Sequence, residues 1–367
     1  MPAFDEKALA KFFDYSFDPD LGWIRKPNTT GTERGRNGDI QFHIDSSGSR
    51  LNSHSDLIPH IAAFGDSYAF CRQVEDDETW EAILAHERGL GVLNYGVGNY
   101  GVDQAVLRYK KTVLPNSVKI VVMGFVPETI CRIQSYWKHY LEFGNTFAWK
   151  PRFILDADGK VNLQENLIKS ISDFQQLDLL LPLIRKHDRF YESKFRNLQF
   201  RFPYVLSFIR NPVRHSKIIF AIAIRNFLRA VGVKNDWAES LPFTLVMKEN
   251  IKHAHELYGD KRSTDLLEAI LIEFKEVAQT RGHLPLVVLM PQLMDLRLIK
   301  NNQIPYAEFF HKLDSQINVI DLTGDFLGQP LEKLYINDQY GGHLSPYGNA
   351  LVSRRISLWL DNAGVDS

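Results

Sequence analysis

Short apolar strand patterns alternate with amphipathic helix patterns along much of this chain, and this alternation constrains its fold most strongly. The first strand pattern covers residues 59–64 and runs directly into the turn 65–67. The other strand patterns cover residues 91–96, 117–125, 284–292 and 317–322, and the helical patterns cover 77–88, 103–114, 263–282 and 346–360. Strands that alternate with helices are typical of parallel sheets, because a parallel connection must cross back over the sheet. Five such strands predict a flavodoxin-like, three-layer α/β/α sandwich around a central parallel sheet.

The same alternation divides the chain into parts. It begins at residue 58, breaks near residue 130 and resumes at residue 263. A chain of 367 residues is longer than a single core usually supports, so an insertion into the sandwich is expected. We predict an N-terminal extension over 1–57, an α/β sandwich domain over 58–130 and 263–367, and a mainly helical inserted subdomain over 131–262. Within the insertion, the pair Asp158-Gly159 suits a hairpin turn between two apolar runs.

Charge and composition exclude several classes of function. The formal net charge of −1 provides no field that would attract nucleic acid or an anionic membrane to the whole molecule. The two cysteines, Cys71 and Cys131, are too few for a disulfide framework. No His/Cys cluster has metal-ligand spacing and no Gly-rich loop ends in Gly-Lys-Ser/Thr, so neither a metal nor another cofactor is predicted. The N-terminus lacks the apolar core of a signal peptide, and no apolar run reaches the roughly 20 residues that span a bilayer. We therefore expect a cytoplasmic protein.

A basic, aromatic stretch covers residues 185–229 of the predicted insertion. Its cationic residues are Arg185, Lys186, Arg189, Lys194, Arg196, Arg201, Arg210, Arg214, Lys217, Arg225 and Arg229, and its acids are Asp188 and Glu192. We interpret the stretch first as a solvated helical face, with contact to a membrane surface or an acidic ligand as the alternative. No RNA-binding signature accompanies it, so nucleic acid is not an expected partner. An insertion at the catalytic end of the sheet would act as a lid over the substrate.

Two polar motifs stand next to elements of the predicted sandwich. Ser67 lies in 64-FGDSYAF-70, directly after the first strand, and His343 lies in 341-GGHLSPYGN-349, just before the last helix. The carboxyl ends of parallel strands form the binding crevice of a doubly wound sheet, so both residues are expected at that end. A serine needs a base to become a nucleophile, and histidine titrates near neutrality. Each motif also has a purely structural interpretation, as a turn after a strand and as the capped start of a helix.

These motifs resemble those of the SGNH, or GDSL-like, hydrolases, a family of ester-cleaving enzymes with a flavodoxin-like fold. The resemblance rests on 65-GDS-67, on 93-LNYGVGNYGVDQAVLRY-109 and on the GHLSPYGN segment, and it covers roughly residues 58–130 and 263–360. It implies that Ser67 is the nucleophile and His343 the general base. It also implies an oxyanion hole made from backbone N–H groups of Ser67 and of the turn that contains Gly98 and Asn99.

The sequence departs from the family pattern at three places. Asn99 replaces a glycine of the second block, and its backbone N–H is expected to serve in the same way, since asparagine tolerates the left-handed region. Glu128 lies in the segment where the family has an asparagine, and we expect it to point away from the oxyanion or to bind another part of the substrate. Asp338 is the nearest candidate for the acid that orients the histidine. The alternatives are a backbone carbonyl in that role, or Asp295 or Asp321.

The residues and the resemblance together predict a serine esterase or deacylase that works through an acyl-enzyme, with an O-acylated carbohydrate as substrate. The carbohydrate is implied by the resemblance alone, and a lipid or thioester substrate stays open. Two alternatives stay open. One is an O-acyltransferase that passes the acyl group to a glycan hydroxyl, and the other is a non-catalytic SGNH-like binding protein in polysaccharide or envelope assembly.

Overall fold

The structure, a computed structural model, describes residues 5–142, 145–200, 202–233, 235–301, 303–336 and 342–364. In this part of the chain a five-stranded parallel sheet lies at the centre. Its strands are β5 (Pro59–Gly65), β6 (Gly91–Gly96), β7 (Ile120–Phe125), β10 (Leu284–Leu289) and β11 (Asn318–Asp321). They lie side by side in the order β11-β10-β7-β5-β6, and each neighbouring pair is parallel. This is the flavodoxin-like strand order, so the predicted fold class is confirmed.

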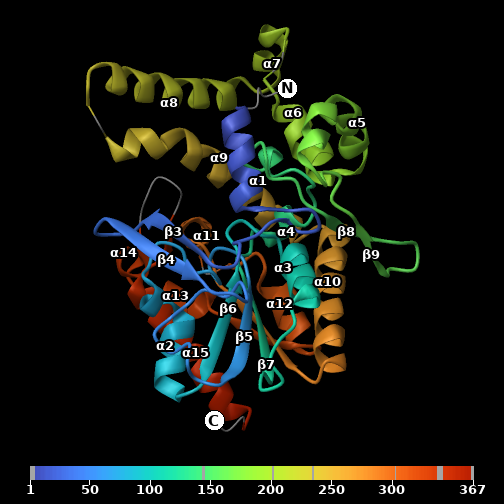
Figure 1. Ribbon diagram of the computed structural model, residues 1–367. Helices are drawn as coiled ribbons and strands as arrows, with labels where there is room; N and C mark the ends of the chain where they lie inside the picture. The colour runs from blue at the N-terminus through green and yellow to red at the C-terminus, as the bar shows by residue number, and fades with distance from the viewer. Residues whose placement is uncertain are drawn as a thin grey trace.

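Helices cover both faces of the sheet (Figure 1). The main covering helices are α2 (Trp80–Arg88), α3 (Val102–Lys111), α10 (Lys261–Thr280), α12 (Ala307–Asp314) and α15 (Pro346–Asn362). Phe64 and Val121 share one apolar core with α3, α10 and α12, whereas Ile61 and Val122 share the other with α2 and α15. Successive strand residues point to opposite faces, so continuous apolar strands supply both cores.

Three predicted strands are shorter than their apolar patterns. The pattern over 284–292 gives a strand that ends at Leu289, and the pattern over 317–322 gives Asn318–Asp321. The pattern over 117–125 gives β7, which begins at Ile120.

The N–H of Val118 donates to the carbonyl of Pro115 (3.0 Å), so a turn precedes β7. Lys119 still bonds to both neighbouring strands: its N–H donates to the carbonyl of His60 (2.8 Å), and its carbonyl accepts the N–H of Leu284 (2.7 Å).

The segment before β5 packs onto the sandwich. It forms α1 (Glu6–Tyr15) and two antiparallel pairs, β1 (Phe17–Asp18) with β2 (Gly22–Trp23) and β3 (Thr29–Arg34) with β4 (Asp39–Ile44). Leu9 and Trp23 are buried in the same core as α3, and Arg50 forms a β-bridge with Asn94 of β6. The segment therefore extends the core of the sandwich.

Short elements form the carboxyl end of the sheet. They are α4 (Thr129–Arg132), α11 (Leu293–Leu298), α13 (Thr323–Leu327), α14 (Leu331–Leu334), and the antiparallel pair β12 (Tyr335–Ile336) and β13 (His343–Leu344). They follow β7, β10 and β11, and β13 leads directly into α15.

The segment between α4 and α10 is mostly helical. Its elements are η2 (Lys138–Tyr140), β8 (Arg152–Leu155), β9 (Val161–Gln164), η3 (Ile171–Gln176), α5 (Leu177–His187), η4 (Tyr191–Phe195), α6 (Arg196–Leu198), α7 (Tyr204–Arg210), α8 (Pro212–Ala230) and α9 (Asp236–Leu257). The β8–β9 hairpin lies where Asp158-Gly159 predicts a turn. In Figure 1, α5 to α9 gather at the end of the sandwich where α4 follows β7. Phe153 and Ile168 of this segment share the core with α3, so its division into a separate subdomain stays a prediction. Within the described residues, no helix has both the length and the apolarity to cross a bilayer.

Candidate active site

Ser67 lies just past the end of the central strand β5. The strand ends at Gly65, whose φ of +152° suits glycine. A Cβ at Gly65 would approach the carbonyl oxygen of Gly124 to 1.8 Å, so the chain turns there only because no side chain is present. The N–H of Val97 donates to the Gly65 carbonyl (3.0 Å), which places the turn after β6 beside the turn that carries Ser67. Ser67 is 4% exposed.

Asp66 holds the turn that carries Ser67. One carboxylate oxygen accepts the N–H of Tyr68 (2.8 Å), and the other accepts the N–H of Val126 (3.1 Å) and the Nη1 of Arg132 (3.2 Å). Burial raises the pKa of Asp66, while Arg132 and the backbone donors oppose the rise. Because Val126 follows β7, these bonds tie the ends of two sheet strands together.

Arg132 joins Asp66 to the predicted site residue Glu128. Its Nη2 lies 2.9 Å from Glu128 Oε2, and its Nη1 also donates to the carbonyl of Tyr100 (3.1 Å). Burial lowers the pKa of Arg132, but the charges of Glu128 and Asp66 outweigh it and the net change is upward. Arg132 therefore stays charged, and the Glu128 carboxylate faces it.

His343 lies in β13, opposite Ile336 of β12, and is 8% exposed. Its Nδ1 lies 3.1 Å from Oε1 of Gln73. The Nε2 of Gln73 donates to the carbonyl of Arg34 (3.1 Å), which turns the amide oxygen toward the imidazole. An amide oxygen can only accept a hydrogen bond, so Nδ1 carries the proton and Nε2 keeps a free lone pair. This is the tautomer that a general base requires.

Tyr68 connects the two predicted catalytic residues. It directly follows Ser67, and its ring centroid lies 5.2 Å from that of His343. Its hydroxyl donates to the carbonyl of Gly342 (2.6 Å), the residue before His343. Two segments that are far apart in sequence thus meet at the side chain of Tyr68.

The surroundings of His343 favour its neutral form. Burial lowers its pKa well below the ordinary value, and the positive charges of Arg72 and Arg132 lower it further. A neutral imidazole can accept a proton, but this environment makes its protonated form costly.

The predicted oxyanion turn lies beside the Ser67 turn. Asn99 has φ +70°, the left-handed region that asparagine tolerates. The carbonyl of Gly98 accepts the Nε1 of Trp23 (3.0 Å), which fixes one side of the turn from the N-terminal segment. A Cβ at Gly96 would lie 2.2 Å from the backbone nitrogen of Phe70, so the two turns pack backbone to backbone.

The alternative acids accept hydrogen bonds from other residues. Asp295 accepts the Nε2 of His255 (2.9 Å) and the N–H of Gln292 (2.9 Å), and Asp321 accepts the N–H (2.9 Å) and the hydroxyl (2.6 Å) of Thr323. Asp338 lies outside the described residues.

Gln73 is the residue that the sequence analysis missed. The family pattern has a carboxylate a few residues before the histidine. Gln73 is a neutral amide and follows Ser67, so this pattern does not predict it. The available signal was a polar residue six positions beyond Ser67, in the loop before η1 (Asp76–Glu78). Among the described residues, no group of three His, Cys, Asp or Glu side chains could hold a metal ion.

No family model and no curated protein matches the sequence. A G-D-S-L family protein from Desulfitobacterium hafniense DCB-2 has a solved structure that is 12% identical, covers 81% of this chain and 97% of its own, and has a TM-score of 0.34. A member of the lipolytic protein G-D-S-L family from Veillonella parvula DSM 2008 is 11% identical, covers 81% of this chain and 94% of its own, and also has a TM-score of 0.34.

Proposed function

We propose that this protein is a serine ester hydrolase in which Ser67 is the nucleophile and His343 the general base. The observation that carries the proposal is the state of His343: it is buried and neutral, its Nδ1–H is held by Gln73, and Tyr68 joins it to the turn of Ser67. A serine at the carboxyl end of a central parallel strand, followed by a tyrosine that contacts an imidazole in the tautomer of a base, supports acyl transfer.

The proposed reaction has two steps. The Ser67 hydroxyl oxygen attacks the ester carbonyl carbon while Nε2 of His343 takes its proton, and the negative charge passes to the carbonyl oxygen. When the intermediate collapses, His343 returns that proton to the leaving alcohol, and the acyl group stays on Ser67. A water molecule, activated by the same nitrogen, then releases the acid.

The oxyanion would be stabilised by backbone N–H groups of Ser67 and of the Gly98–Asn99 turn. Each donor of this kind is typically worth about 10²–10³ in rate. The Glu128 carboxylate bonds the guanidinium of Arg132, which also bonds Asp66 in the Ser67 turn. We propose that Glu128 holds Arg132 in this position and does not contact the oxyanion.

Gln73 would take the orienting role that a carboxylate has in a triad. Its neutral amide fixes the imidazole tautomer but gives no charge to stabilise the imidazolium that forms during attack. Arg72 and Arg132 disfavour that cation as well. We infer a base that is well oriented and weak, so an activated ester should be the more sensitive assay substrate.

Gln73→Glu is expected to move the acidic limb of the pH profile of kcat/KM upward. In the wild type the limb should lie well below pH 6.5, since burial and Arg72 depress the pKa of His343. A carboxylate next to Nδ1 favours the imidazolium and should raise that pKa by about one to three pH units. The measurement is kcat/KM of an activated ester from pH 4.5 to 9.

Gln73→Met is the matched control, because it keeps the side-chain length and removes the amide that bonds His343 and the carbonyl of Arg34. It should lower kcat about 10- to 100-fold with little change in KM, and leave the acidic limb below pH 6.5. An unshifted profile in Gln73→Glu would refute the orienting role.

The proposed substrate is an O-acylated carbohydrate, and the acceptor is water. Transfer to a glycan hydroxyl would use the same Ser67 chemistry, so product analysis with and without a sugar acceptor separates the two reactions.

The proposal is tested directly by a fluorophosphonate probe. The probe is expected to add once to the native protein, with peptide mass spectrometry placing it on Ser67, because only an activated serine reacts quickly. Heat-unfolded protein should not react. A native, folded protein that stays unlabelled at pH 8 would contradict the hydrolase and favour a binding protein.

A further inference from the structure

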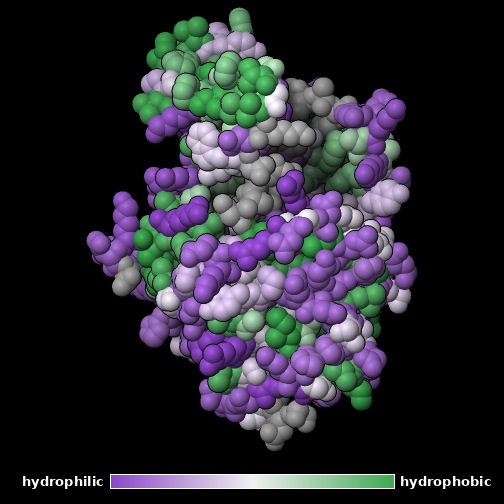
Figure 2. Space-filling view, turned by 90° about the vertical axis from the view of Figure 1, so that its left-hand side faces the viewer, coloured by the Kyte–Doolittle hydropathy of each residue, from purple (hydrophilic) through white to green (hydrophobic). Residues whose placement is uncertain are grey.

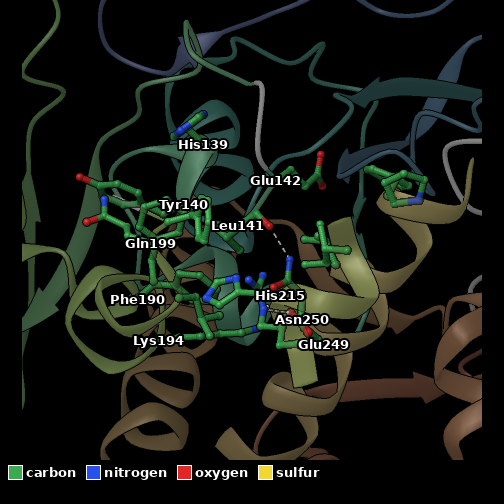
Figure 3. Close-up of a pocket in the computed structure, with 18 of the residues that line it drawn as sticks. His139, Tyr140, Leu141, Glu142, Phe190, Lys194, Gln199, His215, Glu249 and Asn250 are labelled. Carbon is green, nitrogen blue, oxygen red and sulfur yellow. Dashed lines mark hydrogen bonds and ion pairs between the residues drawn. The ribbon is translucent and has the colours of Figure 1, made fainter. Parts of the chain in front are cut away.

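A large cavity lies away from Ser67, between helices of the segment that interrupts the sandwich. It measures about 940 Å³, within the range of ligand pockets. One wall is formed by residues 137–142, α5, η4 and α6, and the other by α8 and α9 (Figure 3).

The wall formed by α8 has an apolar middle and cationic ends. Arg214, Ile218, Ile222 and Arg225 line the cavity, and their spacing of three or four residues places them in one row of the helix. Apolar side chains of the other elements, such as Leu198 of α6, complete the interior. A row of this kind fits a hydrocarbon chain with a charged group at its end.

The charge of the lining is positive. Its cations are Arg185, Lys194, Arg214 and Arg225, and its acids are Glu142 and Glu249. Both acids are already paired, Glu142 with Lys138 (2.9 Å) and Glu249 with Arg214 (2.8 Å). Among the described residues no carboxylate lies within ion-pair distance of Arg185 or Arg225. The unpaired charge therefore favours an anionic ligand.

Two buried nitrogens of the lining lack partners among the described residues. They are Nε2 of His215, a residue only 4% exposed, and Nε of Arg225. Figure 3 shows His215 among the side chains around the cavity. A buried polar atom without a hydrogen bond is costly, and the Nε–H of Arg225 can only donate, so it points to a ligand that supplies an acceptor.

The apolar surface continues from the cavity to the outside. Ile219 lines the cavity and is still 47% exposed, and Phe220, the next residue, is 67% exposed. Val205 and Ile209 of α7 are exposed as well. Figure 2 shows hydrophobic residues gathered at the end of the molecule that these helices form. A patch of this kind marks an interaction site, and it gives a lipid a path of entry.

We propose that this cavity binds an amphiphile with a hydrocarbon chain and an anionic head group, taken from a lipid surface. The chain lies along Ile218 and Ile222, and the head group lies at the Arg225 end of this row, where it accepts a hydrogen bond from the guanidinium. This inference does not depend on ester hydrolysis by Ser67.

The test is isothermal titration calorimetry of the full chain with dodecyl phosphate below its critical micelle concentration. Dodecyl phosphate is expected to bind with one site, because both the chain and the head group find partners. Dodecyl maltoside, which has the same chain and no charge, should bind at least about 10-fold more weakly, and inorganic phosphate should show no saturable binding. Equal affinity for the phosphate and the maltoside would overturn the assignment of an anionic head group.

Two matched pairs of variants locate the site. Arg225→Gln should weaken dodecyl phosphate about 10-fold, while Arg229→Gln, on the same helix but paired with Glu239 and outside the cavity, should bind as the wild type does. Ile222→Trp should block the cavity, while Phe220→Trp, on the exposed face, should not. If Ile222→Trp fails to fold, the arginine pair alone decides. Equal losses in Arg225→Gln and Arg229→Gln, or a wild type that self-associates and binds no amphiphile, would refute the proposal.

Discussion

Ser67→Ala is expected to lower kcat on p-nitrophenyl butyrate by about 10³-fold or more. The substitution removes the hydroxyl that would form the acyl-enzyme and leaves the proposed oxyanion donors, which are backbone groups. The residual rate should be the small part that binding and the oxyanion hole supply without a nucleophile. Steady-state kinetics with the acetate, butyrate and octanoate esters would measure this loss and also rank the acyl length.

A second buried serine provides the control for this variant. Ser353 lies in α15, and its hydroxyl donates to Glu87 (3.3 Å) on the neighbouring helix α2. Ser353→Ala should keep wild-type kcat and KM, because it changes a packing contact and no group of the site. A Ser67→Ala protein that retains activity within about 10-fold of the wild type would remove Ser67 from the mechanism.

His343→Ala is expected to lower kcat by about 10²–10⁴ at pH 7.5, since the proton of Ser67 then has no acceptor. The truncation leaves a space beside Tyr68 and Gln73 of the size of an imidazole ring. Added imidazole should therefore restore part of the activity in the variant. Rate against imidazole concentration, measured beside the wild type, gives the extent of rescue.

His283 is the matched control for the histidine variant. It lies just before β10, at the opposite end of the sheet, where its Nδ1 meets the hydroxyl of Tyr109 (2.8 Å). His283→Ala should keep full activity and show no response to imidazole. Equal losses in both variants would indicate a general effect on folding and would contradict the role of His343.

The fold was predictable because its signals are local. Strands β5, β6, β7, β10 and β11 are short apolar runs, and each is followed by turn residues or a periodic helix. The helical segments between these strands form parallel crossover connections. Such connections allow few orders of the strands in the sheet. At residues 117 and 118 the apolar pattern predicts a strand, but the chain forms a turn from Pro115 to Val118.

The positions of Ser67 and His343 at the carboxyl end of the sheet also follow from local order along the chain. Ser67 comes directly after β5, and His343 directly before α15. The partner of His343 cannot be predicted from local order, because Gln73 is 270 residues away in sequence and carries no charge. The bond exists only because the loop after Ser67 and strand β13 come together in space.

The sequence by itself determined the types and order of the elements, and hence the parallel sheet and the end of it at which Ser67 and His343 lie. The physical reason is that apolar periodicity and turn chemistry act over a few neighbouring residues. Only the tertiary structure decided that Gln73 holds the imidazole, that Arg132 pairs with both Asp66 and Glu128, and that α8 closes a cavity with α9. These contacts join segments far apart in the chain, so they depend on how the packed elements meet.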